Sequence, residues 1–351
     1  MYILIAILIF GVLIAIHELG HFLVAKAFGV RVNEFAIGMG PAIFKKQKGE
    51  TLYALRVLPL GGFCAMEGED SDSEDPRAFT SQKPWKRALI LIAGSATHFV
   101  LGLLMITLLY SSAQAFATRT VDSTVDGFRY GGESGIMAGD EILSIDGHRI
   151  FYSSDFSTYM DRSGETVEMV VRRNGEKVTL SDYPLQRETY VVDGEEVLKY
   201  GVNFRLETAT FGNKLKNSLY CGADFVRLVW MGLSDLITGA VGVKDLSGPV
   251  GIVSTISEVG ESASSTGEAL SNILYLAAFI TINLAVMNLL PIPALDGGRV
   301  FFLLVTTLIE AVTHKHIDPK YEGYIHAAGL VLLLGLMGVV LVNDIGRILH
   351  G

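Results

Sequence analysis

Two histidines four positions apart lie inside an apolar stretch at residues 1–27, in the run His-Glu-Leu-Gly-His. If this stretch is a helix, His17 and His21 project from the same face, one turn apart. Both rings can then bind one tetrahedral Zn²⁺. Glu18 is placed to accept a proton from a metal-bound water. The motif therefore predicts a zinc hydrolase site with His17 and His21 as ligands and Glu18 as the catalytic base.

A catalytic zinc site holds three protein ligands and keeps one position open for water. The chain contains only Cys64 and Cys221 as thiols, too few for a cysteine site. Asp296 is the best third ligand, because it lies in an interrupted apolar stretch and is followed by Gly297 and Gly298. The alternative is an Asp that only stabilises a turn before two glycines.

Three further residues are candidates for contact with a substrate. Asn288 and Pro291 lie in the interrupted stretch that carries Asp296. The Asn288 amide suits a substrate carbonyl or its oxyanion, and the alternative is a residue that ends a helix. His98 lies in another apolar stretch, where it could contact substrate or metal. An interhelical hydrogen bond is the alternative for His98.

The composition favours a membrane protein with a polar domain. Half of the 351 residues are hydrophobic, and the mean hydropathy is +0.41. The net charge of -9 argues against nucleic acid as a partner. The lipid bilayer is the expected partner of the apolar segments.

Apolar stretches long enough to cross a bilayer occur in four regions, and a crossing needs only about 20 residues. The third region exceeds this length and contains Pro291 and Pro293, so it is predicted to be a broken helix within the bundle. The four predicted regions are about 1–27, 88–117, 270–312 and 324–345.

Basic residues near the ends of the predicted spans indicate the orientation. They cluster in the linkers 28–87 and 313–323, which are therefore assigned to the cytoplasm. Both termini and the large central domain are then extracytoplasmic, and the metal site lies toward the cytoplasmic side. The basic residues are Arg31, Lys83, Lys86, Arg87, Lys315 and Lys320.

The central region becomes polar and rich in predicted strands. Asn174-Gly175 between two alternating runs is typical of a hairpin with a type I′ turn. Before the second span, alternating residues lead to Gly61-Gly62, which predicts a strand and then a glycine-rich turn. Residues 211–240 are predicted to form an amphipathic helix pair in the membrane interface, and the alternative is that the pair packs against the central domain. The expected organisation is a membrane-core half (1–117) with a membrane-associated β-loop (30–65), a β-rich domain (118–207), an amphipathic linker (208–268) and a second membrane-core half (269–351).

The sequence resembles the site-2 protease family of M50-type intramembrane zinc metalloproteases, specifically the bacterial regulator-of-sigma-E protease type with one PDZ domain. The likeness covers nearly the whole chain. The matching motifs are His17–Phe22, Gly38–Pro41, Pro59–Phe63, Gly135–Gly147, Leu246–Ile252 and Asn288–Arg299.

The resemblance implies a multi-pass helical protein of the bacterial inner membrane with an inserted, extracytoplasmic PDZ-like domain at 118–207. It implies zinc-dependent cleavage within single-span membrane proteins, such as anti-sigma factors or signal-peptide remnants, after a first cut by another protease. Asn288 would help hold the substrate. The glycine-rich segment 38–63, with Gly61 and Gly62, could add a strand to an unwound substrate.

The chain departs from this family at two places. His98 stands where relatives commonly carry an Asn, and the PDZ-like region lacks a clear carboxylate-binding loop. That domain could therefore contact a peptide or substrate, or act as a size filter. Two other classes remain: a membrane adaptor that uses the PDZ-like domain, and a divalent-metal transporter with an intramembrane His and Asp site.

Overall fold

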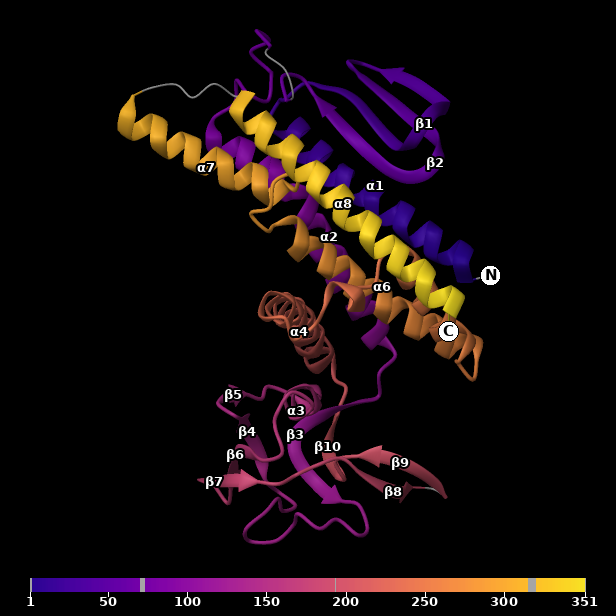
Figure 1. Ribbon diagram of the computed structural model, residues 1–351, viewed down its shortest axis with the longest axis vertical. Coiled ribbons are helices and arrows are strands. Elements are labelled where there is room, and N and C mark those ends of the chain that lie inside the picture. Colours follow the sequence, from indigo (N-terminus) through magenta and orange to yellow (C-terminus); the bar gives the residue numbers. More distant parts are fainter. Residues whose placement is uncertain (1, 70–72, 193, 315–319, 351) are drawn as a thin grey trace. The chain divides into compact units, whose positions relative to one another are not determined.

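The computed structural model describes residues 2–69, 73–192, 194–314 and 320–350 (Figure 1). The chain divides into two compact units. One consists of Met1–Leu109 and Cys221–Gly351, and the other of Tyr110–Tyr220. Lys315, used in the orientation argument, lies outside the described residues.

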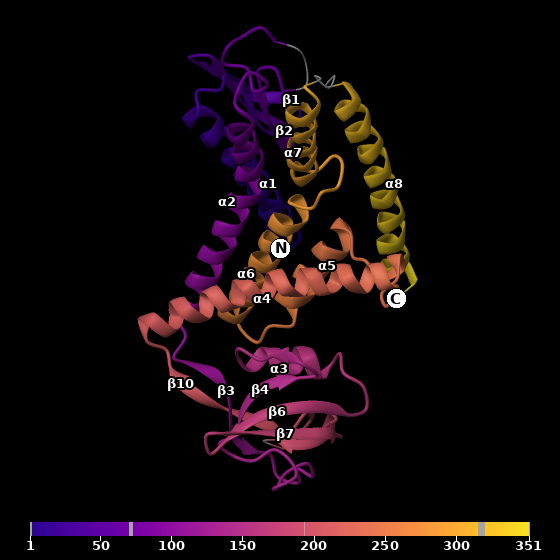
Figure 2. The ribbon, with the colours of Figure 1, turned by 90° about the vertical axis from the view of Figure 1, so that its left-hand side faces the viewer.

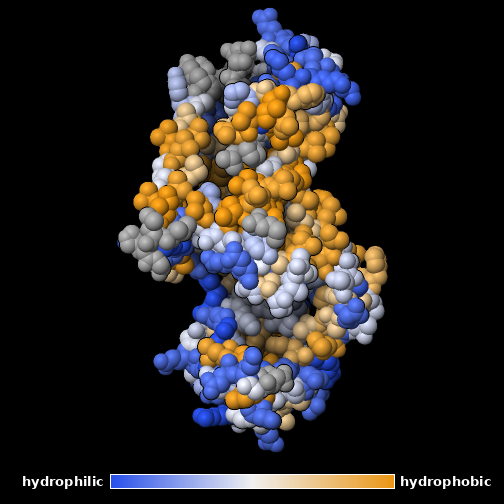
Figure 3. Space-filling model, turned by 90° about the vertical axis from the view of Figure 1, so that its right-hand side faces the viewer, coloured by the Kyte–Doolittle hydropathy of each residue, from blue (hydrophilic) through white to orange (hydrophobic). Residues whose placement is uncertain are grey.

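Within the described residues, four helices of the first unit are long and apolar enough to cross a membrane. This agrees with the predicted multi-pass helical class. In the most apolar 18-residue stretch of each helix, only 17% of the residues of α1 and 6% of those of α8 are buried. Both helices therefore present apolar side chains outward. Hydrophobic side chains cover much of this surface (Figure 3). The four are α1 (Tyr2–Ala27), α2 (Pro84–Ser111), α6 (Thr266–Asn288) and α8 (Lys320–His350).

The second span is displaced from the predicted 88–117. Helix α2 begins at Pro84, ahead of that range, and ends at Ser111. Residues from Ala115 onward form strand β3, where Ala115 pairs with Thr208. An unbroken apolar run does not show where helix gives way to strand, so its length alone placed the boundary too late.

The third apolar region is interrupted. Helix α6 ends at Asn288 and α7 (Asp296–Thr313) begins after a short irregular segment. Pro291 and Pro293 lie in this segment, where they lack the N–H groups that a helix requires. Figures 1 and 2 show α7 and α8 as separate helices after this break. The ring of Phe302 on α7 packs edge-on against His326 on α8.

A curled sheet follows α1, made of β1 (Val32–Lys48) and β2 (Thr51–Met66). The first half of β1 pairs with both halves of β2: Phe35 has Tyr53 and Cys64 as partners. The predicted strand followed by a glycine-rich turn agrees with the structure. Residues 52–55 of β2 run parallel to residues 34–37 of β1, whereas residues 62–66 run antiparallel to the same part of β1, so β2 reverses its direction before Gly62. Gly61 lies in this reversal and has a positive φ.

The sequence motif at 246–252 forms the start of helix α5 (Pro249–Glu261), after the short helix η1 (Val243–Asp245). The backbone N–H groups of Gly248 and Gly251 donate to the Asp344 carboxylate of α8, at 3.1 and 2.8 Å. Asp344 is buried. A carboxylate at a helix N-terminus satisfies otherwise unpaired N–H groups, so Asp344 fastens α8 to α5.

The second unit contains a six-stranded sheet of order β10-β3-β4-β6-β7, with β5 on β4. The predicted hairpin is confirmed: β6 and β7 pair antiparallel, and Asn174 and Gly175 both have positive φ. Phe156 of α3 is buried in its core. The elements are β3 (Ala115–Thr124), β4 (Glu141–Ile145), β5 (His148–Arg149), α3 (Ser153–Met160), β6 (Val167–Arg173), β7 (Glu176–Tyr183), β8 (Glu188–Val192), β9 (Glu195–Lys199) and β10 (Val202–Thr208).

The predicted amphipathic helix pair at 211–240 is one continuous helix, α4 (Phe211–Thr238). Gly222 does not break it, because a helix tolerates an isolated glycine. That glycine serves close packing: a Cβ there would lie 2.5 Å from Leu103 Cδ2 of α2. Large apolar side chains along α4 remain exposed, including Phe211, Trp230 and Ile237.

Candidate metal centre

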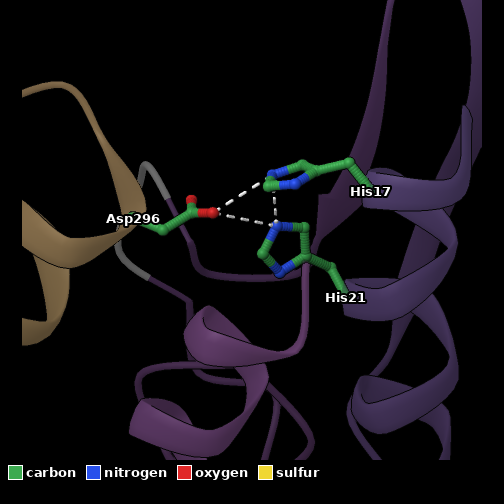
Figure 4. Close-up of side chains that lie close together, drawn as sticks. All are labelled: His17, His21 and Asp296. Atoms are coloured by element: carbon green, nitrogen blue, oxygen red, sulfur yellow. Dashed lines mark hydrogen bonds and ion pairs between the residues drawn. The ribbon is translucent and has the colours of Figure 1, made fainter. Parts of the chain in front are cut away.

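The two histidines of α1 and the first residue of α7 meet at one point (Figure 4). His17 Nε2 lies 3.1 Å from Asp296 Oδ2, and His21 Nε2 lies 3.4 Å from the same oxygen. The two Nε2 atoms are 3.1 Å apart. Within the described part of the chain, His17, His21 and Asp296 form the one group of at least three His, Cys, Asp or Glu side chains that could hold a metal ion.

These separations fit the edges of a tetrahedron around zinc. Two nitrogen ligands 2.0–2.1 Å from a tetrahedral Zn²⁺ are about 3.3–3.4 Å apart, close to the 3.1–3.4 Å found here. Three acceptor atoms directed at one point repel one another unless a cation lies between them. Two imidazoles and one carboxylate are a donor set typical of catalytic zinc, with a fourth position left for water.

The His21 ring is held in the orientation that a ligand needs. Its Nδ1 lies 2.8 Å from the carbonyl oxygen of Ile90 on α2. A carbonyl only accepts, so Nδ1 carries the hydrogen and Nε2 keeps a free lone pair toward His17 and Asp296. Cys64 is buried, and it is not a member of the group that can hold a metal ion.

Gly94 of α2 leaves space for the two histidine rings. A Cβ at this position would lie 2.5 Å from His21 Nε2 and 2.8 Å from His17 Nε2. On the α1 side, a Cβ on Gly20 would lie 2.5 Å from the carbonyl oxygen of Ala93. The two helices therefore approach closely through paired glycines, as small residues permit in membrane bundles. No local signal in the sequence marks Gly94 as part of the site.

The segment before α7 folds tightly to present Asp296. Ala294 adopts a left-handed conformation, with φ of 76°. A Cβ on Gly297 would lie 2.2 Å from the carbonyl carbon of Leu289, and one on Gly298 would lie 2.2 Å from the carbonyl oxygen of Ile292. The two glycines are therefore required because the segment folds back onto the first turn of α7.

Strand β2 passes beside the predicted base. Glu18 lies on α1 between the two histidines, and a Cβ on Gly62 would lie 3.3 Å from Glu18 Cγ. Gly61 has a φ of 85°, in the region that favours glycine. The structure thus brings Gly62 next to Glu18, and Gly61 is its neighbour on the same strand.

His98 is almost fully buried, with 2% of its surface exposed. Its ring centroid lies 5.2 Å from that of His17, and its Nδ1 has no hydrogen-bond partner among the described residues. His98 lies one helical turn after Gly94, and helical side chains point back over the preceding turn. It is therefore directed toward the space that Gly94 leaves beside the rings.

Asn288 and Pro291 are not in the metal group. Asn288 is the last residue of α6, and its amide makes no hydrogen bond within the described residues. Pro291 lines an apolar cavity of about 570 Å³ together with Leu290, Phe99 and Trp230. Ser95 also lines it, and its buried Oγ is unpartnered among the described residues. Ser95 follows Gly94 directly, so this cavity adjoins the helix turn that faces the histidines.

A family model for peptidase family M50 matches residues 5–336. A protein of Clostridium perfringens, provisionally named a zinc metalloprotease, is 37% identical over 348 residues that cover 98% of each chain. Zinc metalloprotease RasP of Geobacillus kaustophilus is 30% identical over an alignment that covers 97% of each chain. The predicted resemblance to M50-type zinc metalloproteases is confirmed over nearly the full length. The chain belongs to peptidase family M50.

Proposed function

We propose that this M50 peptidase is a zinc-dependent endoprotease that cleaves transmembrane segments of single-span membrane proteins. The observation that carries the proposal is that His17 and His21, on a helix long and apolar enough to span a membrane, meet Asp296 of α7 at tetrahedral spacing. The relatives described above bear the name of zinc metalloproteases, which supports zinc as the ion held by these three residues.

The chemistry assigned to each residue follows from its position. Zinc, when bound, supplies the Lewis acidity that makes water a nucleophile near neutral pH. Glu18, one residue after His17, accepts the proton of the attacking water and delivers it to the leaving amine. The Ile90 carbonyl keeps His21 Nε2 directed at the ion.

A substrate helix must unwind before its peptide bond can be attacked, because helical carbonyls are shielded by their own hydrogen bonds. The unwound segment would lie along strand β2. This location is supported by the close approach of Gly62 to Glu18. An extended peptide beside Gly61 and Gly62 would gain main-chain hydrogen bonds. Asn288 and Pro291 would hold it from the other side, and His98 would donate to its carbonyl oxygen.

The orientation and the domain roles are also part of the proposal. The basic residues of the two linkers, 28–87 and 313–323, support a cytoplasmic location for that side of the bacterial inner membrane. Both termini would then be extracytoplasmic, together with the unit at residues 110–220. This β-rich unit would be a PDZ-like domain that contacts a peptide or the substrate, and the exposed apolar residues of α4 would lie in the membrane interface.

A divalent-metal transporter is less well supported. Transport requires successive ligand groups along a path, and one such group is found within the described residues. A glutamate beside the histidine pair has no role in that function. A membrane adaptor that uses the PDZ-like domain would not need His17, His21 and Asp296 at tetrahedral spacing.

The test replaces Glu18→Gln in the full chain, reconstituted in a bilayer with a single-span model substrate. Gln keeps the size and polarity but not the base, so cleavage should fall by at least 1000-fold while zinc remains bound. Glu165→Gln, at an exposed position of the second unit, is the matched control and should cleave normally. Unchanged cleavage by the Glu18 variant would overturn the proposal.

A further inference from the structure

We infer that His326 of α8 is a positioning residue for the metal centre, holding the turn that presents Asp296. This inference rests on the proposed zinc site. His326 is not itself a member of the metal group. Its contact is with the backbone N–H of Ala294, which lies 2.9 Å from His326 Nδ1. Ala294 is two residues before Asp296.

The hydrogen bonds of the turn explain why an external acceptor is needed. The N–H of Ile292 donates to Leu290 O at 2.7 Å, and that of Leu295 donates to Ile292 O at 3.1 Å. Pro293 has no N–H. Ala294 is the remaining donor of this segment, and it points to α8 rather than back into the turn. A polar N–H at membrane depth is costly when unsatisfied, so His326 completes the turn.

Ala294 makes this acceptor more important because its φ of 76° is a conformation that residues other than glycine rarely adopt. Such a conformation persists only where its surroundings fix it. The Ala294–His326 hydrogen bond is one such constraint. The close approach of α8 is a second, since a Cβ on Gly329 would lie 2.4 Å from Pro293 Cβ.

The His326 ring is itself held by packing against α7. It packs edge-on against Phe302 of α7, with ring centroids 5.5 Å apart. Nδ1 accepts a hydrogen bond, so the neutral ring carries its hydrogen on Nε2, which lies 3.7 Å from Glu322 Oε1. An immobilised ring can set the position of the turn, and α7 begins at Asp296 immediately afterward.

The consequence is a residue remote from the ligands that controls how well the carboxylate meets the two histidines. Residues that orient metal ligands without touching the ion typically change metal affinity or activity by about 10–100-fold. His326 would act on the turnover rate and on zinc retention, with little effect on substrate binding.

The test compares His326→Asn with His326→Gln in the purified full chain. The Asn oxygen can occupy the place of Nδ1, whereas the Gln oxygen extends to the place of Nε2. We expect the Gln variant to lose zinc to a chelator about 10–100-fold faster and to lower kcat with little change in KM. The Asn variant should stay within about threefold of the parent in both measurements. His314→Asn, at the exposed end of α7, is the control and should match the parent.

Equal losses in the Asn and Gln variants, including equal failure to fold, would overturn the inference, because the role would then be packing. Zinc release and kcat at parental values in the Gln variant would overturn it as well. Neither result would affect the proposed function, which fails separately if Glu18→Gln still cleaves substrate.

Discussion

His21 Nδ1 donates a hydrogen bond to the carbonyl oxygen of Ile90, which ties a candidate zinc ligand on α1 to the backbone of α2. The same helix carries Gly94, whose missing side chain makes room for the two histidine rings. Helix α2 thus orients His21 with a backbone carbonyl, and it leaves space for both histidine rings because Gly94 has no Cβ. A main-chain acceptor is not removed by a side-chain substitution, so Gly94 is where this arrangement can be tested.

Replacing Gly94→Ala should impair zinc binding. Its Cβ would lie within 2.8 Å of both Nε2 atoms, closer than real Cβ contacts allow, so the rings must move. We expect zinc affinity to fall by at least about 10-fold, by analogy with the loss of groups that orient ligands, and cleavage to fall with it. Titration against a zinc chelator measures the first effect. Gly338→Ala is the control, because that position of α8 meets open space.

Replacing Asp296→Asn should weaken zinc binding without unfolding the helices. The amide keeps the shape of the side chain but removes the negative charge, and zinc prefers carboxylate oxygen as its third ligand beside two imidazoles. Bound zinc per chain, measured after dialysis at submicromolar free zinc, should drop well below one. Asp126→Asn, at an exposed position of the second unit, should retain full occupancy. Full occupancy in both variants would exclude Asp296 as a ligand.

Replacing Asp344→Ala should detach α8 from α5. The buried carboxylate accepts from two backbone N–H groups, and hydrogen bonds to a charged group contribute about 1.5–3 kcal/mol each. We expect a loss of about 3 kcal/mol in unfolding free energy, measured by denaturant titration in detergent. Asp344→Asn, which keeps one acceptor oxygen, should lose less. Equal stability of the Ala variant and the parent would show that the contact contributes nothing.

Acid should loosen the segment that joins β2 to α2. Glu50 accepts from Lys26 at 2.7 Å and from Arg77 at 2.5 Å, and these hydrogen bonds lower its pKa from the ordinary 4.5. A lowered pKa stabilises the fold above 4.5, and this stabilisation is lost as pH falls through the lowered value. Cleavage by pepsin around Arg77 should therefore increase only at pH values below the ordinary 4.5, where Glu50 becomes protonated. Glu50→Gln should remove this dependence, and a parent profile that is flat to pH 2 would refute the argument.

Much of the candidate site was predictable because its signals are local. The spacing of His17 and His21 follows from helix geometry, and Asp296 was marked by the prolines and glycines around it. The structure brings these three residues together. The four spans followed from length and hydropathy.

The rest depends on contacts between distant segments. Gly94 lies in a helix that is apolar on all sides, so hydropathy does not reveal which face meets α1. His326 carries no local signal, since nothing near it in the sequence points to the turn at Ala294. The turn at Gly61-Gly62 was predictable from its glycines, but the pairing of the following residues back onto β1 is a long-range contact.

The metal centre draws its parts from near the two ends of the chain. Synthesis makes His17 and His21 first, and Asp296 follows only after the second span and the β-rich unit have been made. A partly synthesised chain therefore holds two imidazoles and the proposed base Glu18 but lacks the carboxylate. On the proposed mechanism, cleavage can start only after Asp296 has been synthesised and has met the two histidines.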